Sequence, residues 1–315
     1  MAFTCERLTF DSSDGKHTIA AHLYLPVLED GERPKAIIQF SHGMTEYSGR
    51  YTETAAFFAD HGYIFAINDY LGHGESVSSP DELGFFAEED GPDTVVSDLY
   101  KFSRILRERF AGLPLILIGH SMGSFLARLY AMHYGSGLAA LVILGTGGPQ
   151  RLVGLGKALA RFIMACHSPR YRSKFLKKVA MSGYNAHYGK GADPDAWLTS
   201  DAASVQASHD DPLCGFTFTA QAYYDLFDMS ERVNRKDAAM RFPKNLPVFI
   251  ASGLEDPVGN YGKGPSIVYD RLTEAGLTDV TMKLYPGARH ELQHEFCKDE
   301  FFNDVLSFIE KHVGQ

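Results

Sequence analysis

Seven short stretches of this chain are rich in apolar residues, and the central ones are apolar along their whole length rather than at alternate positions. Strands that are covered on both faces have this pattern, because neither face meets water. Between the stretches, apolar residues recur every three or four positions, as in amphipathic helices, over 92–110, 122–134 and 298–312. Strands and helices therefore alternate, which predicts an α/β fold with a mostly parallel sheet flanked by helices. The expected strands are 19–26, 35–43, 63–69, 114–121, 138–148, 246–253 and 279–287.

The alternation stops between Gly148 and Leu246, where helix-like patterns continue without a convincing strand. A loop of this length without structure of its own would be unusual in a compact domain. We therefore predict an α/β core, residues 1–148 and 246–315, that carries an inserted helical cap over residues 149–245.

The composition argues against several classes of protein. The chain carries a net charge of −9, whereas nucleic-acid binders present a basic surface, so no nucleic-acid partner is expected. The four cysteines are scattered without a C-x-x-C pair, which argues against a structural zinc site, and we expect reduced thiols and no metal. No signal peptide and no apolar window long enough for a membrane helix is evident. We expect a soluble, cytoplasmic protein; the sequence leaves its oligomeric state open.

One glycine-rich motif combines a serine with a suitable position in the fold. The stretch ILIGHSMGSF places Ser121 between Gly119 and Gly123, with an expected strand before it and an expected helix after it. A G-x-S-x-G motif alone also occurs by chance in glycine-rich turns. Between a strand and a helix it forms a sharp turn that exposes the serine hydroxyl at the carboxyl edge of the sheet, where ligands bind in α/β folds. The motif therefore indicates a nucleophilic serine.

A nucleophilic serine needs a base, and the base needs a third group to orient it. On a fold of this kind the acid and then the histidine follow the serine in the chain, each after a later strand. Asp256 follows the strand 246–253, and His290 follows the strand 279–287. The alternatives are Glu255 and His294; Asp256 is favoured by the turn at the adjacent proline, and His290 by its closeness to the strand end.

Ester cleavage also needs backbone N–H groups that stabilise the negative charge on the carbonyl oxygen. One N–H is expected from Met122, the residue after the serine, and a second from Met44, in the His-Gly-Met turn after the strand 35–43. His73, in the segment NDYLGHGES, is a possible second base, but a structural turn explains it better because His290 already occupies the expected place in chain order.

Together these segments resemble the serine α/β-hydrolases of the monoacylglycerol lipase and lysophospholipase group, which are serine aminopeptidase S33-like hydrolases. The resemblance rests on HGMTEYSGRY, GHSMGS, SGLEDPVG and YPGARHELQHE and covers nearly the whole chain. It implies an eight-stranded sheet, a helical cap, and hydrolysis of a lipid-like carboxylic ester without a cofactor. Tyr47, Leu71 and Ser124 depart from the pattern of the group, where histidine, arginine and glycine are usual. None of these departures removes a catalytic atom.

Two parts of the expected cap bear on the substrate. Residues 151–178 contain eight lysines and arginines and no acidic residue, which indicates either a transient contact with a membrane surface or the solvated face of ordinary helices. The stretch 214–229 is rich in large apolar rings. By the resemblance it faces the active site, where an acyl pocket could be lined by Phe216, Phe218, Tyr223 and Phe227.

Other functions are compatible with the same fold. An iminopeptidase usually has a bulky aromatic residue after the nucleophile, where this chain has Met122. A small-ester hydrolase, a cofactor-free haloperoxidase or a C–C hydrolase would use the same residues, and a binding protein that has lost its chemistry would not need them. The sequence leaves open the acyl length, the headgroup, and the preference for esters or amides.

Overall fold

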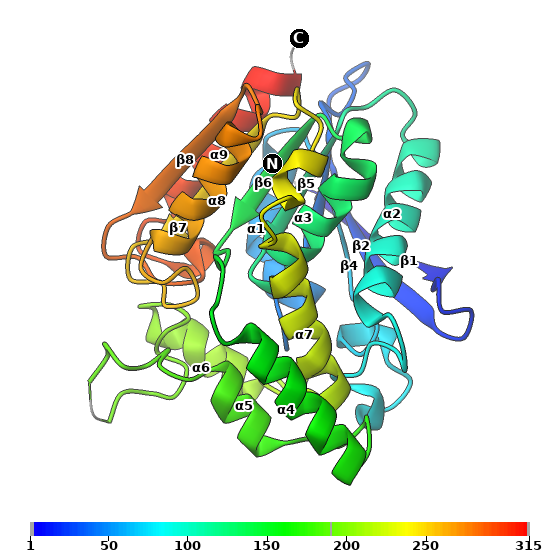
Figure 1. Cartoon of the computed structure of the whole chain (residues 1–315). Coiled ribbons are helices and arrows are strands. Elements are labelled where there is room, and N and C mark those ends of the chain that lie inside the picture. Colours follow the sequence, from blue (N-terminus) through cyan, green and yellow to red (C-terminus); the bar gives the residue numbers. More distant parts are fainter. Residues whose placement is uncertain (1–2, 190, 314–315) are drawn as a thin grey trace.

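The chain folds around one eight-stranded sheet in the computed structural model, which describes residues 3–189 and 191–313. The strand order is β1-β2-β4-β3-β5-β6-β7-β8. β1 and β2 are antiparallel to their neighbours, and the other strands run parallel (Figure 1). The eight strands predicted by the resemblance are therefore present. They are β1 (Phe3–Asp11), β2 (Thr18–Pro26), β3 (Ile37–Ser41), β4 (Ile64–Asn68), β5 (Leu115–His120), β6 (Ala140–Leu144), β7 (Val248–Gly253) and β8 (Val280–Tyr285).

Burial of the central strands accounts for their apolar sequences. Every residue of β3, β4, β5, β6 and β7 is buried. Alternate residues of β5 pack on opposite faces, with Leu115 and Leu117 in one core cluster and Ile116 and Ile118 in the other. β1 is absent from our seven expected strands because it lies at the edge of the sheet, where most of its side chains stay partly or fully exposed.

Helices cover both faces of the sheet. One face packs against α2 (Gly91–Arg109), α3 (Met122–Tyr134) and α8 (Lys263–Glu274), and the other against α1 (Thr52–Asp60) and α9 (Lys298–Val313). Figure 1 shows the first three in front of the strands and the other two behind them. The helices predicted over 92–110, 122–134 and 298–312 correspond to α2, α3 and α9, each within one residue at either end.

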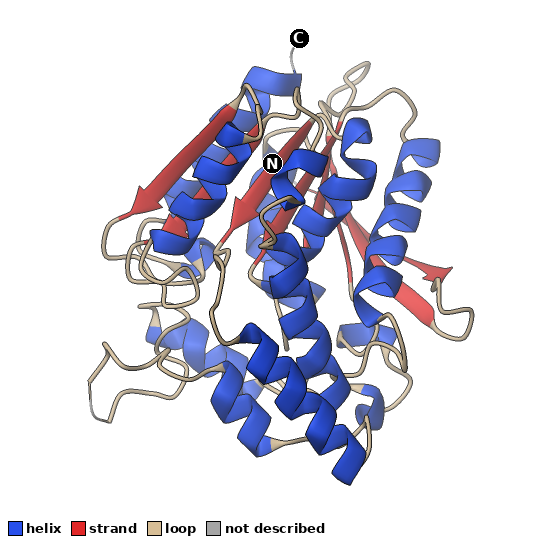
Figure 2. Ribbon diagram, viewed as in Figure 1, coloured by secondary structure: helices blue, strands red, loops and turns tan. Residues whose placement is uncertain are grey.

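Four further α-helices lie between β6 and β7 in the described part of the chain. They are α4 (Val153–Cys166), α5 (Lys174–Ala180), α6 (Ala202–Asp210) and α7 (Ala220–Val233). Figure 2 shows the arrowheads of the parallel strands pointing toward the end of the molecule where these helices gather. No strand occurs among the described residues of this insertion. The insertion therefore stands over the carboxyl edge of the sheet.

A buried arginine joins the two ends of the insertion to the core. Arg128 of α3 donates to the backbone oxygen of Gly147, where the chain leaves the sheet, at 3.3 Å. It also donates to the backbone oxygen of Val233, at 2.6 Å, and to the side chain of Asn234, at 3.1 Å, at the end of α7. Its partners are neutral oxygens, and burial lowers the pKa of Arg128 to about 9. The helix that follows Ser121 thus fixes both ends of the insertion.

Candidate active site

Ser121 occupies a strained turn between β5 and α3. Its backbone has φ 54° and ψ −121°, in a region of backbone conformation that residues other than glycine rarely adopt. The two flanking glycines are required by packing: a side chain on Gly119 would clash with the Gly123 backbone, and one on Gly123 would clash with the backbone oxygen of Ser41. The strand–turn–helix arrangement that the motif predicts is therefore present.

Asp256 and His290 lie together after β7 and β8. His290 Nδ1 is 3.0 Å from Asp256 Oδ1, and the two residues are 2% and 0% exposed. The Asp256 carboxylate also accepts hydrogen bonds from the Val258 backbone, at 2.9 Å, and the Ser252 hydroxyl, at 3.2 Å. Burial alone would lower the pKa of His290, but the charge of the neighbouring Asp256 carboxylate outweighs it and raises the pKa above its ordinary value.

The structure distinguishes the alternatives that the sequence leaves open. Glu255 is exposed, whereas Asp256 is buried against His290. Burial lowers the pKa of His294, which forms no ion pair with Asp256 in the described part of the chain. His73 is fully buried among aromatic rings, and burial lowers its pKa to about 3. It accepts a hydrogen bond from the Thr45 backbone, at 3.3 Å, as expected for a structural histidine.

The loop that carries Met44 is held by a buried carboxylate. Glu46 Oε1 accepts from the Gly43 backbone N–H, at 2.5 Å, and from the Tyr51 hydroxyl, at 2.7 Å. Burial alone would raise the pKa of Glu46, but hydrogen bonding to His120 and the charge of Arg50 lower it overall. Met44 lines a small cavity together with Ser121 and His290, and Met122 is the buried first residue of α3. Met44 therefore lines one cavity with Ser121, and Met122 directly follows the serine at the start of α3.

An ion pair that was not predicted from the sequence joins this loop to the loop that carries His290. Arg50 donates two hydrogen bonds to the Glu291 carboxylate, at 2.7 and 2.9 Å, and a third to Glu46, at 3.2 Å. Glu291 directly follows His290. The only sequence signal is that both residues belong to the segments quoted for the resemblance; the pairing crosses 241 positions of the chain.

The insertion is fastened to the histidine loop as well. The Glu295 carboxylate accepts from the backbone of Arg289, at 3.0 Å, and from the backbone of Ser200, at 2.8 Å, and it also binds the Ser200 hydroxyl. The Glu291 backbone N–H donates to the Leu198 oxygen at 2.7 Å. The ring of Trp197 lies 5.1 Å from the ring of His290. Residues 197–200 of the insertion therefore hold the loop that carries His290.

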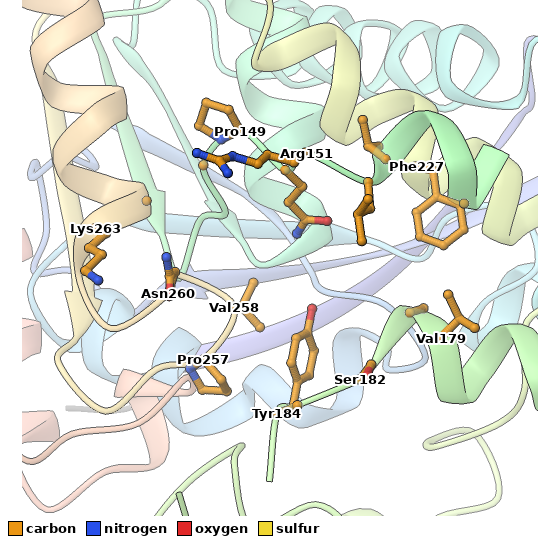
Figure 3. Close-up of a pocket in the computed structure, with 18 of the residues that line it drawn as sticks. Pro149, Arg151, Val179, Ser182, Tyr184, Phe227, Pro257, Val258, Asn260 and Lys263 are labelled. Atoms are coloured by element: carbon orange, nitrogen blue, oxygen red, sulfur yellow. The ribbon is translucent and has the colours of Figure 1, made fainter. Parts of the chain in front are cut away.

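Two cavities lie near these residues. The first, of about 40 Å³, is lined by Ser121, His290, Met44 and the charged side chains of Glu46, Arg50 and Glu291, among others. The second, of about 680 Å³, lies between the insertion and the core, and Figure 3 shows side chains from both reaching into it. The end of α5 and the turns after it divide the two cavities, because Lys177 and Met181 line the first and Val179 and Tyr184 the second.

The predicted acyl pocket needs a correction. Of its four residues only Phe227 lines the large cavity, and Phe216, Phe218 and Tyr223 line neither cavity. The ring of Phe218 lies 5.5 Å from that of His73 and 5.7 Å from that of Tyr223, and both Phe218 and Tyr223 are fully buried. Aromatic side chains also pack well against one another in a protein core. The sequence could not show whether these rings line a substrate pocket or pack in the core.

Two further observations concern the described part of the chain as a whole. One group of three metal-ligating side chains comes together there, Asp193, Asp195 and His209, with its ligand atoms within 4.8 Å of one another. His209 Nε2 already pairs with Asp195, at 3.0 Å, and the group is largely solvent-exposed.

No helix in residues 3–189 or 191–313 is both long and apolar enough to cross a bilayer.

Known proteins are similar to this chain over most of its length. The family described as "Serine aminopeptidase, S33" matches residues 32–296. The human "Monoglyceride lipase" is 28% identical over 291 residues, which cover 90% of this chain and 83% of that protein. The "Monoacylglycerol lipase" of Mycolicibacterium smegmatis is 26% identical, covering 89% and 90%. A carboxyl esterase from Bacillus coagulans, solved in complex with glycerol, is 28% identical, with a TM-score of 0.91 over 99% of this chain and all of that one.

Proposed function

The chain belongs to the serine aminopeptidase S33 family of hydrolases and is a carboxylic ester hydrolase, and we propose that it cleaves lipid-like esters of the monoacylglycerol or lysophospholipid type with Ser121, His290 and Asp256. The observation that carries the proposal is the buried pair of His290 and Asp256 beside the strained turn of Ser121. In this arrangement a serine becomes a nucleophile without a metal or cofactor.

The first half of the proposed reaction forms an acyl-enzyme. His290 Nε2 takes the proton of the Ser121 hydroxyl as the oxygen attacks the ester carbonyl. The tetrahedral oxyanion lies against the backbone N–H groups of Met44 and Met122, and one such donor contributes about 3 kcal/mol to the transition state. His290 then gives its proton to the departing alcohol. Asp256 stays ionised, fixes the tautomer of His290 and stabilises the imidazolium.

The second half releases the acid. Water replaces the alcohol, and His290 takes a proton from this water as it attacks the acyl carbon of Ser121. The tetrahedral intermediate collapses, the proton returns to Ser121 through His290, and the fatty acid leaves. The ion pair of Arg50 and Glu291 keeps the loops of the oxyanion donors and of the base at a fixed separation through both halves.

The two cavities suggest where the substrate binds. A cavity of about 40 Å³ is far below the range of small-molecule sites, about 300–1,000 Å³, so it does not hold a lipid chain. The large cavity, of about 680 Å³, is in the range of small-molecule sites. In the proposal the acyl chain therefore lies in the large cavity, against Phe227, and the polar alcohol lies beside Arg50 and Glu46. For the acyl chain to enter, the turn at Tyr184, which helps to separate the two cavities, must move.

We also propose that residues 149–245 act as a cap that meets lipid surfaces. In the basic segment 151–178, Leu155 and Phe162 of α4 are 66% and 65% exposed, which is unusual for side chains of this size. Apolar side chains interleaved with cations are typical of helices that lie on anionic membranes. Serine at both positions should weaken co-sedimentation with anionic vesicles, whereas Met240→Ser, at an equally exposed position outside the segment, should not. Equal binding by all three proteins contradicts the membrane contact.

Hydrolysis of a matched ester panel tests the catalytic proposal. The panel contains p-nitrophenyl acetate to palmitate, a monoacylglycerol and a lysophosphatidylcholine. We expect turnover to peak on medium or long chains, and Ser121→Ala to lose activity by at least about 10⁴-fold. Ser97→Ala, the same chemical change on the surface of α2, should keep full activity. Full activity of Ser121→Ala refutes the mechanism, and turnover confined to acetate refutes the lipid substrate.

A peptidase is the second candidate, because the matching family is described as a serine aminopeptidase. The same residues would attack an amide carbonyl, with the amine in place of the alcohol. A proline naphthylamide added to the panel separates the two functions. If Ser121-dependent cleavage of this amide exceeds that of every ester, the peptidase assignment replaces the lipase assignment.

A further inference from the structure

The large cavity has an uneven distribution of charge. Among the described residues, its lining contains two charged side chains, Arg151 and Lys263, and no acidic residue. They come from the two parts of the chain that enclose the cavity: Arg151 lies just before α4 of the insertion, and Lys263 is the first residue of α8 of the core. In Figure 3 the Arg151 side chain extends toward the side of the cavity where Lys263 and Asn260 lie. Cations from the insertion and from the core therefore border one side of the space.

Neither cation has an acidic partner. In the described chain, the side chains of Arg151 and Lys263 form no ion pair or hydrogen bond, although many other exposed cations of the protein are paired. The chain carries a net charge of −9, so acidic residues are plentiful elsewhere. Two unpaired cations beside a cavity without acids create a local positive potential, which attracts an anion.

The rest of the cavity is suited to a hydrocarbon chain. Apolar side chains from α4, α5, α7 and α8 face the space together with the loop after β7. Burial of a hydrocarbon chain against them favours binding, because it removes apolar surface from water. The apolar residues that line the cavity include Leu152, Val153, Val179, Phe227, Val258 and Ile267.

We propose that this cavity binds a single-chain amphiphile with an anionic head, its head between Arg151 and Lys263 and its chain against the apolar wall. A fatty acid carboxylate is the occupant we infer, because hydrolysis at Ser121 releases one beside the cavity; only this choice of source rests on the proposed function. The bound product then occupies the space that the next substrate chain needs, so the enzyme is inhibited by its own product. An alkyl phosphate has the same chemistry and is the competing source.

Binding to the Ser121→Ala protein tests the site without catalysis. The ligands are laurate, dodecanol as its neutral counterpart, and dodecyl phosphate. Each is added below its solubility limit or micelle concentration, and binding is followed by displacement of a dansyl-labelled undecanoic acid. We expect laurate to bind about tenfold more tightly than dodecanol, and the double change Arg151→Ala and Lys263→Ala to abolish that difference. Lys16→Ala with Arg33→Ala alters the net charge equally at exposed positions that line neither cavity, and it should leave the difference intact.

Each outcome decides the proposal. Equal affinity for laurate and dodecanol, or an unchanged preference in the Arg151 and Lys263 double variant, overturns the anionic site. Dodecyl phosphate binding more than tenfold tighter than laurate overturns the fatty acid as occupant and assigns a phosphate head instead. Loss of the preference in both double variants refutes a local site, because it shows an effect of net charge alone. If laurate binds as expected but no ester is cleaved, the proposed function fails while the site stands.

Discussion

Asp225 offers a test of how burial sets the stability of the insertion. It lies on α7, is 2% exposed, and sits against Gly91 at the start of α2. Its Oδ1 accepts a hydrogen bond from Gln221 at 2.9 Å, but its Oδ2 has no partner among the described residues. Burial, with smaller contributions from Asp228 and Asp90, raises the pKa of Asp225 to about 7.

The direction of the effect follows from proton binding. Between the unfolded pKa of about 4 and the folded pKa of about 7, the folded protein holds a proton that the unfolded chain has lost. Stability is therefore complete at low pH and falls as the pH rises toward 7. A difference of about three pH units corresponds to about 4 kcal/mol of unfolding free energy. Asp225→Asn keeps the shape and the Gln221 contact but cannot ionise, so it should escape this loss.

Urea unfolding of the wild type and Asp225→Asn at pH 5 and pH 8 measures the effect. We expect the stability advantage of the variant to grow by about 2–3 kcal/mol between the two pH values. Asp228→Asn on the same helix is the matched control. Asp228 pairs with Lys157 at 2.7 Å and is partly exposed, so its loss should cost at most about 1 kcal/mol and should not add to stability at pH 8. The reasoning is refuted if Asp225→Asn is less stable than the wild type at pH 8, or if its advantage is the same at both.

Three further outcomes are expected. Gly123→Ala should yield little folded, active enzyme, because the added methyl group would clash with the Ser41 backbone; soluble protein with normal esterase activity contradicts this. Ester hydrolysis should fall at low pH with a midpoint above 6.5 in kcat/KM, because the base must be neutral and the pKa of His290 is raised; a midpoint at or below 6.5 argues against that role. Glu295→Ala should cost about 1–3 kcal/mol and lower kcat, because it removes the acceptor of two part-buried backbone hydrogen bonds at the loop that carries His290. Glu300→Ala, which removes an exposed ion pair, should do neither; urea unfolding and ester assays measure both effects.

Much of the fold could be predicted because it depends on local pattern. Fully apolar stretches require strands covered on both faces, and β3 to β7 have that burial. The spacing of Gly119 and Gly123 around Ser121 requires a turn too tight for side chains, which the packing of both glycines bears out. β1 was not predicted, because an edge strand with exposed side chains lacks the apolar run that marked the others.

The sequence narrowed the candidate site without completing it. Chain order and strand ends placed Asp256 and His290 at one edge of the sheet, but the adjacent Glu255 remained an alternative to Asp256. Only the path of the loop decided that Asp256 is buried against His290 while Glu255 faces solvent. Two adjacent residues of a loop can point in opposite directions, one into the interior and one to solvent. A loop has no regular periodicity from which this can be predicted.

The contacts between distant segments were decided by the tertiary structure alone. Arg50 meets Glu291 across 241 positions, and the large cavity forms because α4 and α5 pack over the loop after β7. The aromatic stretch 214–229 illustrates the limit: its rings were expected around the substrate, yet most of them pack on one another and on His73. Local patterns determine which residues are buried and in what conformation. Which buried residues meet depends on how the layers pack, and that is a property of the whole chain.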